Sequence, residues 1–231
     1  DAHDVHICEI AMAKFSLKHG LIKDFQVEIC PGILPSGAEC QAKLKSMESH
    51  RYELPAKGAK ESDYIQILLH MIDILENDDQ FEEGFPIIFT EGNTKGLPDQ
   101  KLLINTQRAM IKIVEKCCEY KLATDLRVYP LSMLVYYLDQ VISLEKNIGA
   151  TDKVQSFQNV AEAHLNFDFA MHDYEVTTEG CEFHNEIDAK KNCCLSKVRR
   201  FSYALAKLFS NPQKYPFVEG QHYPEGYNAF N

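Results

Sequence analysis

Hydrophobic residues at the start of the chain alternate with polar ones in the way that half-buried strands require. The first alternating segment spans residues 5–17, and the second, with a cleaner alternation, spans residues 22–30. His19-Gly20 lies between them and is typical of a turn. We therefore expect these two strands to pair, and a third strand near residues 38–44 would complete an antiparallel meander.

One position in the first segment is unusual for the face of a strand that packs on a core. Glu9 shares its parity with Ile7, Ala11 and Phe15, which places its carboxylate on a largely apolar side. A buried carboxylate needs a partner, whereas one near the end of a strand can reach water. On the pattern alone, contact with solvent is the simpler interpretation.

Beyond residue 60 the hydrophobic period becomes helical. Four helices are predicted from apolar residues three or four positions apart: one capped by Ser62, one opening at Pro98-Asp99, one following Pro130, and one spanning residues 191–209. Short apolar strands are predicted at residues 87–89 and 126–129, and the tail from about residue 211 is expected to be irregular. Strands followed by alternating helices and strands predict one α/β domain over residues 1–231, with a mixed five-stranded sheet flanked by helices. The meander-first order is the ribonuclease-H-like pattern, although other α/β folds share it.

Composition and charge narrow the class of protein. The chain has 231 residues, of which 45% are hydrophobic, and this is typical of a globular protein. It contains no apolar run of the roughly 20 residues needed to cross a bilayer, and its first residues lack the features of a signal peptide. The net charge of −10 disfavours tight, nonspecific binding to nucleic acid. A nucleic-acid partner would need a local basic patch.

The eight cysteines indicate a reducing compartment. Two pairs are vicinal, Cys117-Cys118 and Cys193-Cys194, and adjacent cysteines suit a disulfide framework poorly. We therefore expect reduced thiols in an intracellular protein.

The segment with the clearest chemistry is Cys181-x2-His184, followed by Cys193. Two thiols and an imidazole within a short stretch are the ligands that tetrahedral zinc prefers. The spacing supplies three ligands and leaves the fourth open. It could be Cys194, His172, Asp188 or a residue distant in the sequence.

Several short segments together carry a family resemblance. They are Cys8-Glu9-Ile10, Phe15-Ser16-Leu17, Ile29-Cys30-Pro31-Gly32, Cys40-Gln41-Ala42, Ser49-His50, and the Cys181-x2-His184…Cys193 block followed by Leu195. In this combination, over essentially the whole chain, the sequence resembles the Maelstrom domain. The resemblance implies a ribonuclease-H-like fold related to DnaQ-type exonucleases. It also implies a role in the piRNA pathway, which silences transposons in germ cells.

The resemblance also implies a set of metal ligands. The family pattern is Glu, His, His, Cys, His, Cys, and its metal ligands match Glu9, Cys181, His184 and Cys193 here. His50 matches the first family histidine, with no clear role, and His70 is only a guess for the second. Four protein ligands would leave no position for a reactive water, so a structural zinc is expected.

The acidic residues argue against the usual nuclease chemistry of this fold. Two-metal nucleases hold their ions with clustered carboxylates, and an exonuclease-type first strand carries an Asp and a Glu two residues apart. This first strand offers Glu9 alone. His184 and Asp188 echo the exonuclease His and Asp, but at a spacing one residue short, and Asp168 and Asp173 stand apart from any motif. A magnesium- or manganese-dependent 3′ exonuclease is therefore a weak third option.

Two functions of different class remain. The resemblance implies a metal-independent endoribonuclease acting on single-stranded RNA. The alternative is an inactive RNA- or protein-binding adaptor, which the acidic charge and the missing acids favour. Candidate phosphate contacts are Lys190, Lys191, Lys197, Arg199 and Arg200, and candidate acid–base groups are His50, His164 and His172. We further expect a monomer that works with piRNA-pathway proteins, without a membrane, in the nucleus and in perinuclear cytoplasmic granules of germ cells.

Overall fold

A long β-hairpin lies at the centre of the fold. A computed structural model describes residues 6–30, 34, 37–52, 62–75, 87–94, 97–98, 100–117, 126–147 and 156–227. Strands β1 (Glu9–Ser16) and β2 (Gly20–Glu28) pair antiparallel, with Glu9 opposite Glu28 and Ser16 opposite Gly20. The first two predicted strands and the turn between them are confirmed.

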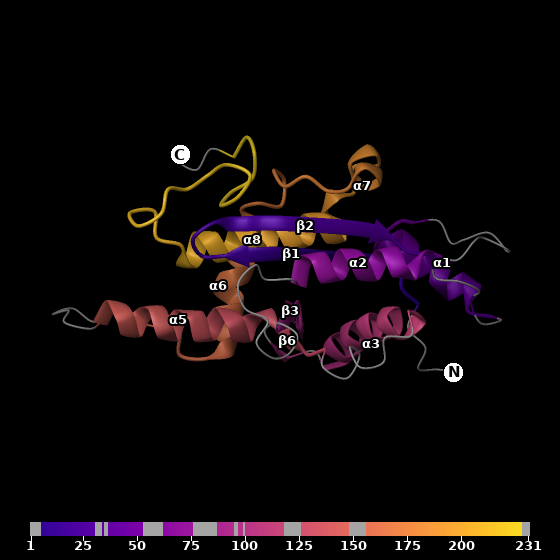
Figure 1. The fold of residues 1–231 in the computed structure, drawn as a ribbon, viewed down its shortest axis with the longest axis horizontal. Coiled ribbons are helices and arrows are strands. Elements are labelled where there is room, and N and C mark those ends of the chain that lie inside the picture. Colours follow the sequence, from indigo (N-terminus) through magenta and orange to yellow (C-terminus); the bar gives the residue numbers. More distant parts are fainter. Residues whose placement is uncertain are drawn as a thin grey trace.

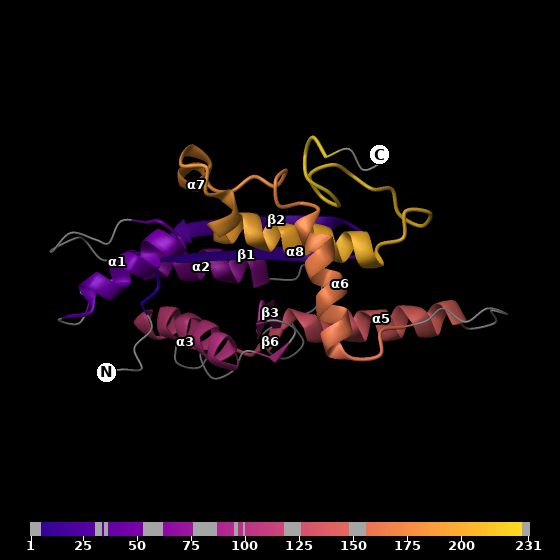
Figure 2. The same cartoon turned by 180° about the vertical axis from the view of Figure 1, so that it is seen from behind.

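Helices cover both faces of this hairpin. Helix α8 (Cys194–Phe209) packs on one face and α2 (Tyr64–Leu75) on the other, as the two opposite views in Figures 1 and 2 show. Every residue of β1 is consequently half-buried. Ile10 and Met12 face the cluster that includes α2, whereas Glu9 faces the start of α8. Helix α8 therefore covers the side that combines the Glu9 and Ala11 face of β1 with the Gln26 and Glu28 face of β2, although the β2 residues resemble a solvent-facing side.

The third predicted strand is wrong, because residues 39–48 form helix α1 (Glu39–Glu48). This segment, ECQAKLKSME, consists mainly of strong helix formers and contains no β-branched residue. Local helix propensity therefore decided the outcome, and the predicted meander ends after two strands.

Helix α2 begins at a different cap from the one predicted. The Asp63 side chain accepts hydrogen bonds from the backbone N–H groups of Ile65 and Gln66, at 3.1 and 3.2 Å. The Ser62 hydroxyl instead accepts from the backbone N–H of Cys30, over 2.8 Å, and so fixes the end of β2. The prediction of Ser62 as the cap was wrong by one residue.

The remaining strands are short and lie in separate pairs. Strand β3 (Ile88–Thr90) pairs in parallel with β6 (Val128–Pro130), and β4 (Asn93–Thr94) pairs with β5 (Leu97–Pro98). Within the described ranges the strands thus form three two-stranded sheets. The α/β class is confirmed, but these ranges do not show the expected five-stranded sheet. Asp99, the second residue of the predicted Pro98-Asp99 opening, lies outside them, as does Cys118.

Three further helices complete the body of the fold. Helix α3 (Gln100–Lys116) and helix α5 (Leu131–Asn147) correspond to predicted segments, whereas α6 (Val160–His172) was not predicted. The sequence did carry a signal for the start of α6, namely Asn159 followed three residues later by Glu162. In the structure the Asn159 side chain accepts a hydrogen bond from the backbone N–H of Glu162 over 3.0 Å. One core cluster gathers around α2 and α3 and a second around α5, α6 and α8. No helix within the described ranges is long and apolar enough to span a bilayer.

The C-terminal tail is irregular, as expected, but it packs on the hairpin turn. The backbone N–H of Leu21 donates to the carbonyl oxygen of Gln221 over 2.8 Å. The buried His222 ring accepts from the backbone N–H of Val218 and donates through Nε2 to the carbonyl oxygen of Lys18, at 3.1 and 3.2 Å. The tail therefore fastens the closed end of the hairpin.

Candidate metal centre

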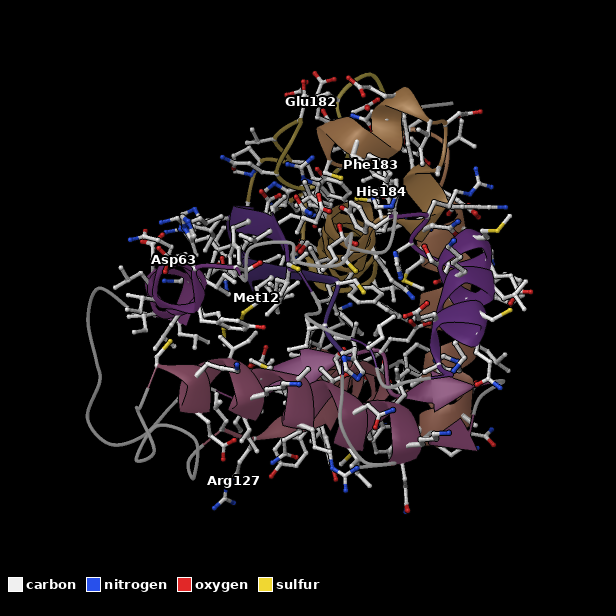
Figure 3. The ribbon with its side chains drawn as sticks, turned by 90° about the vertical axis from the view of Figure 1, so that its right-hand side faces the viewer. Met12, Asp63, Arg127, Glu182, Phe183 and His184 are labelled. Atoms are coloured by element: carbon white, nitrogen blue, oxygen red, sulfur yellow. The ribbon has the colours of Figure 1, made fainter. Side chains whose placement is uncertain are left out.

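The Cys181-x2-His184 motif is presented by a single turn of helix. Cys181 is the N-cap of α7 (Glu182–Glu186), so the residue three positions later, His184, returns to the same side. In Figure 3, Glu182 lies at the outer edge of the molecule, and Phe183 and His184 lie successively closer to its body. Burial follows the same order, and the His184 side chain is completely buried.

Cys193 reaches the same point from the other side of a tight loop. It ends the short helix η1 (Lys190–Asn192) and is the N-cap of α8. The Asn185 side chain bridges the backbone N–H and carbonyl of Gly180, at 3.0 and 3.3 Å, and so closes the loop before α7. A Cβ atom at Gly180 would lie 3.2 Å from the Cys193 sulfur, which is a tight contact. The glycine therefore allows Cys193 to approach Cys181.

Glu9 joins these residues from the opposite end of the chain. Its Oε1 atom lies 4.0 Å from His184 Nδ1 and 3.9 Å from Cys193 Sγ. Its Oε2 atom accepts from the backbone N–H of Cys194 over 3.3 Å. With only 2% of its side chain exposed, Glu9 does not reach solvent, and the simpler interpretation of its position was wrong.

The four side chains form a group that could hold a metal ion. One ligand atom from each of Glu9, Cys181, His184 and Cys193 lies within 4.8 Å of all the others, and Cys181 Sγ is 3.1 Å from His184 Nδ1. Ligands bound tetrahedrally at about 2.0–2.3 Å lie about 3–4 Å apart, so this spacing fits one ion. The structure thus brings together all four residues that the resemblance indicated.

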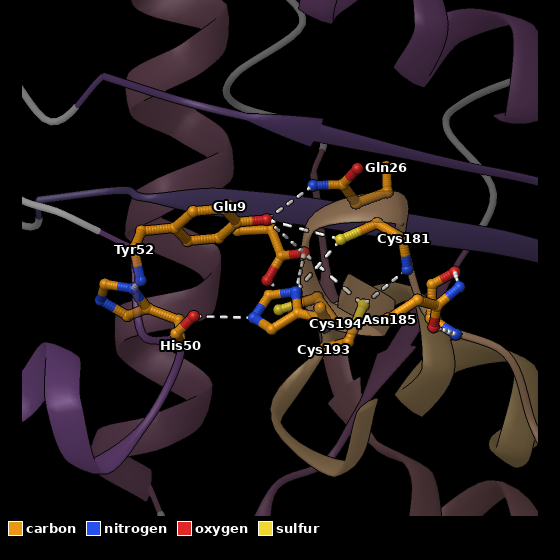
Figure 4. A network of polar contacts seen from close by, with 10 residues as sticks. Glu9, Gln26, His50, Tyr52, Cys181, Asn185, Cys193 and Cys194 are labelled. Carbon is orange, nitrogen blue, oxygen red and sulfur yellow. Dashed lines mark hydrogen bonds and ion pairs between the residues drawn. The ribbon is translucent and has the colours of Figure 1, made fainter. Parts of the chain in front are cut away.

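The segment after α1 supports this group from outside. His184 Nε2 donates to the carbonyl oxygen of His50 over 2.7 Å. The Tyr52 hydroxyl lies 3.3 Å from Glu9 Oε1 and 3.7 Å from Cys181 Sγ, as Figure 4 shows. The His50 ring itself accepts from the backbone N–H of Tyr52 over 3.1 Å and is not among the four ligand candidates. Burial lowers the pKa of His50, so this ring favours its neutral form.

Burial also sets the protonation of the groups at the centre. It raises the pKa of the Cys193 thiol, so without an adjacent cation this group is a neutral thiol at neutral pH. It raises the pKa of Tyr52 in the same way, with a further contribution from the nearby Glu9 carboxylate. Tyr52 is therefore a hydrogen-bond donor. A bound divalent ion would instead lower the pKa of the Cys193 thiol, because coordination favours the thiolate.

The other ligands considered for the fourth position lie elsewhere. Cys194 hydrogen-bonds Glu9 through its backbone N–H and its thiol but is not one of the four ligand candidates, while His172 is exposed and pairs with Glu175 at 3.1 Å. Asp188 is exposed after α7, in the left-handed conformation (φ 51°). His70 stacks on Phe25, with 5.7 Å between ring centroids, and is not part of the group. The seven cysteines of the described ranges are free thiols.

Intramolecular partners engage most of the predicted basic cluster. Lys190 pairs with Glu179 at 2.6 Å, and Lys197 pairs with Glu91. Arg199 contacts both oxygens of Asp24 on β2, at 2.6 and 3.3 Å. These contacts are structural, so the role of these residues in RNA binding remains a prediction.

Arg200 and Lys191 differ from the other members of this cluster. Arg200 was a candidate phosphate contact, but it is buried and donates to the carbonyl oxygen of Lys191 over 3.3 Å. Burial lowers its pKa. Lys191 is exposed, and no ion pair involves its side chain within the described part of the chain. Lys191 is therefore the cluster member best placed to meet a phosphate.

The remaining candidate acids and bases are also dispersed. Asp168 pairs with the buried His164 at 3.2 Å, and Asp173 pairs with Lys207. Burial raises the pKa of Asp168. Across the described ranges, the Glu9 group is the one set of three or more potential ligands close enough to share an ion, and it contains a single carboxylate.

Tyr52 is the residue of this centre that sequence reasoning missed. It lies 43 positions from Glu9 and 129 from Cys181. A lone tyrosine in an irregular segment carries no motif, so the sequence held no signal for it. Its place depends entirely on how the chain folds.

The fold and this group together define an α/β domain in which one Glu-Cys-His-Cys candidate metal centre connects the first strand to the last helix. The family model described as "Maelstrom: piRNA pathway germ-plasm component" matches residues 2–229. The chain therefore belongs to the Maelstrom family.

Individual relatives agree with this assignment. The chain is 25% identical to Protein maelstrom homolog of Culex quinquefasciatus over 218 residues, which covers 94% of this chain and 39% of that protein. It is 22% identical to Protein maelstrom of Drosophila melanogaster, covering 96% of this chain and 45% of that protein. It is also 22% identical to Protein maelstrom 2 of Drosophila persimilis, covering 96% and 48%. The chain thus spans about half the length, or less, of these relatives.

Proposed function

We propose that Glu9, Cys181, His184 and Cys193 bind one Zn²⁺ as a structural centre. The observation that carries this proposal is the approach of two thiols, an imidazole and a carboxylate to within 4.8 Å of one another. Sulfur and nitrogen ligands suit zinc, and four protein ligands leave no position for a reactive water. The ion would join the beginning of β1 to the beginning of α8, so that its binding energy stabilises the fold.

Metal analysis of the purified protein tests the zinc centre. We expect about one zinc per chain in the unmodified protein, as for a closed four-ligand site. Cys181→Ser and His184→Ala should lose most of it. Cys40→Ser is the matched control, because Cys40 is an exposed thiol on α1 outside the ligand group, and it should keep its zinc. Unchanged zinc in both ligand variants would contradict the proposal.

We further propose that the domain acts on single-stranded RNA as part of a piRNA-pathway factor that silences transposons, as an endoribonuclease without the usual two-metal acidic site. Membership of the Maelstrom family supports the pathway. The single carboxylate of the Glu9 group, which the zinc proposal already uses, supports a mechanism without two catalytic metals. A ribonuclease-H-like ancestry remains part of this proposal, as do a monomeric state, piRNA-pathway protein partners, and a location in the nucleus and perinuclear granules.

An RNA- or protein-binding adaptor without catalysis is the second candidate, and a specific observation favours it. Of the five predicted phosphate contacts, Lys190, Lys197 and Arg199 already pair with carboxylates, and Arg200 is buried. With a net charge of −10, the remaining positive surface at this position is small. The domain would then keep a nuclease-like fold without its chemistry.

Labelled single-stranded RNA distinguishes the candidates. The purified domain is incubated with the RNA with and without EDTA, alongside Lys191→Glu, which changes an exposed charge. Internal cleavage that persists in EDTA and weakens in Lys191→Glu supports the endoribonuclease. RNA binding without cleavage supports the adaptor. Digestion from the 3′ end that requires magnesium or manganese would instead indicate the exonuclease option.

A further inference from the structure

We propose that Tyr52 is a positioning residue of the zinc centre, whose hydroxyl group donates a hydrogen bond to the ligands Glu9 and Cys181. The inference rests on the zinc centre proposed above and adds a residue that is not itself a ligand. Its hydroxyl oxygen lies 3.3 Å from Glu9 Oε1 and 3.7 Å from Cys181 Sγ.

The direction of this hydrogen bond follows from Gln26. The Gln26 side-chain amide donates to the Tyr52 hydroxyl oxygen over 3.2 Å, so that oxygen already acts as an acceptor. A phenol has one proton to donate. Glu9 Oε1 and Cys181 Sγ are the other polar contacts of this hydroxyl (Figure 4). The Glu9 carboxylate accepts, and Cys181 accepts when zinc holds it as a thiolate. The proton is therefore directed at the ligands.

The Tyr52 donor matters because a zinc-occupied site carries a net negative charge that needs hydrogen-bond donors. Two thiolates and a carboxylate around a divalent ion, with a neutral imidazole, leave one net negative charge. Water cannot solvate that charge well, because the Glu9 and His184 side chains are 2% and 0% exposed. Hydrogen-bond donors from the protein must take the place of water.

The donors around the centre are distributed so that each anionic ligand has one. The backbone N–H of Cys181 donates to Cys193 Sγ over 3.2 Å, and that of Cys194 donates to Glu9 Oε2 over 3.3 Å. Tyr52 serves the two acceptors that remain, Glu9 Oε1 and Cys181 Sγ. Unlike the two backbone donors, the Tyr52 hydroxyl can be removed by a substitution.

The fold holds Tyr52 firmly in this place. Its ring stacks on Phe183, with 4.6 Å between centroids, and meets the edge of the His184 ring at 5.0 Å. The turn before it is closed by the backbone N–H of Arg51, which donates to the carbonyl oxygen of Ser46 over 2.7 Å. The hydroxyl is therefore presented to the ligands without further ordering of its side chain.

Tyr52→Phe tests the proposal, because it removes the hydroxyl and keeps the stacked ring. Zinc affinity is measured by competition with a chelator of known affinity, and the site geometry is followed by the absorption bands of the cobalt-substituted protein. We expect about 10–100-fold weaker zinc binding and shifted thiolate-to-cobalt bands. Tyr203→Phe is the matched control: Tyr203 is equally buried, at 5% exposure, and donates to the Gly220 carbonyl oxygen over 3.3 Å. It should match the unmodified protein.

The outcomes separate this inference from the zinc centre itself. Equal affinity and identical cobalt spectra in Tyr52→Phe and the unmodified protein would overturn the role of Tyr52 and leave the zinc centre intact. Failure of the unmodified protein to bind zinc would overturn both. If Tyr52→Phe does not fold, Gln26→Leu replaces it, since this change removes the amide that orients the phenol. A smaller loss of zinc affinity is then expected, and no loss would overturn the inference.

Discussion

His184 donates a hydrogen bond from Nε2 to the backbone carbonyl oxygen of His50, over 2.7 Å. A carbonyl oxygen can only accept, so the imidazole proton of the neutral ring lies on Nε2. Nδ1 is left with its lone pair, at 3.1 Å from Cys181 Sγ and 4.0 Å from Glu9 Oε1. The protein therefore selects the tautomer in which His184 can act as a metal ligand, and it holds the ring in that orientation.

Metal removal should lower the stability of the whole domain. Because the proposed ion joins β1 to α8, a chelator should remove the binding contribution, which is about 4 kcal/mol at a thousand-fold excess of zinc over its Kd. For a chain of this size the melting temperature should fall by roughly 10 °C. Differential scanning calorimetry with and without chelator measures this. The double variant Cys181→Ser/His184→Ala should show no further fall with chelator, and an equal fall in this variant would contradict the proposed site.

The ion pair between Arg199 and Asp24 should contribute measurably to the stability of the hairpin–α8 contact. Both side chains are mostly buried, at 26% and 17% exposure, and they share two hydrogen bonds. We expect Asp24→Asn and Arg199→Gln each to cost about 1–2 kcal/mol, with a coupling of about 1 kcal/mol in a double-mutant cycle followed by urea unfolding. The Lys190–Glu179 pair, whose carboxylate side chain is 58% exposed, is the control and should couple more weakly. Strict additivity for Arg199 and Asp24 would argue against their ion pair.

Gly20→Ala should release the C-terminal tail from the hairpin turn. Gly20 has a φ of +68°, and a Cβ atom there would lie 2.4 Å from the carbonyl oxygen of Gln221. The backbone cannot yield as a side chain can, so we expect a loss of about 2–3 kcal/mol and faster proteolysis of the tail. Gly37→Ala separates backbone strain from the steric clash. Gly37 also has a positive φ (+87°), but nothing lies within 4 Å of a Cβ atom there. It should cost less and leave the tail protected; equal effects would rule out the steric explanation.

Substitutions in the basic cluster should separate RNA contacts from structural ones. We expect Lys191→Glu to weaken binding to single-stranded RNA and to reduce its salt dependence, with little change in melting temperature, because Lys191 is exposed. Arg199→Glu should instead unfold at a lower temperature, since it places a second carboxylate beside that of Asp24. Filter binding at several salt concentrations, paired with melting curves, measures both effects. RNA affinity that is unaffected in Lys191→Glu would place the RNA surface elsewhere.

Much of the fold could be predicted because local sequence and final structure agree. The two hairpin strands, the turn at Gly20 and the helices α2, α3, α5 and α8 follow from hydrophobic period and turn residues. The errors arose where two local signals competed or one was overlooked. Residues 38–44 were assigned to a strand although the helix propensity of residues 39–48 is high, and the cap provided by Asn159 was not recognised.

For the metal candidates, too, the sequence indicated some residues and only the fold revealed others. The Cys181-x2-His184 spacing by itself indicated a metal site, because one helical turn brings residues three apart to the same side. The spacing did not indicate Glu9, which the family resemblance supplied, and neither source indicated Tyr52. These residues reach the centre only because α8 packs on the Glu9 side of the hairpin and the turn after α1 folds back over it.

The sequence alone determined which residue types could bind an ion and most of the segments that would become strands and helices, since both depend on neighbours along the chain. Tertiary structure decided which distant side chains complete the centre. It also paired or buried four of the five predicted phosphate contacts. The reason is physical: hydrogen bonds and ion pairs act over a few ångströms in space, and chain separation does not constrain which residues come within that distance.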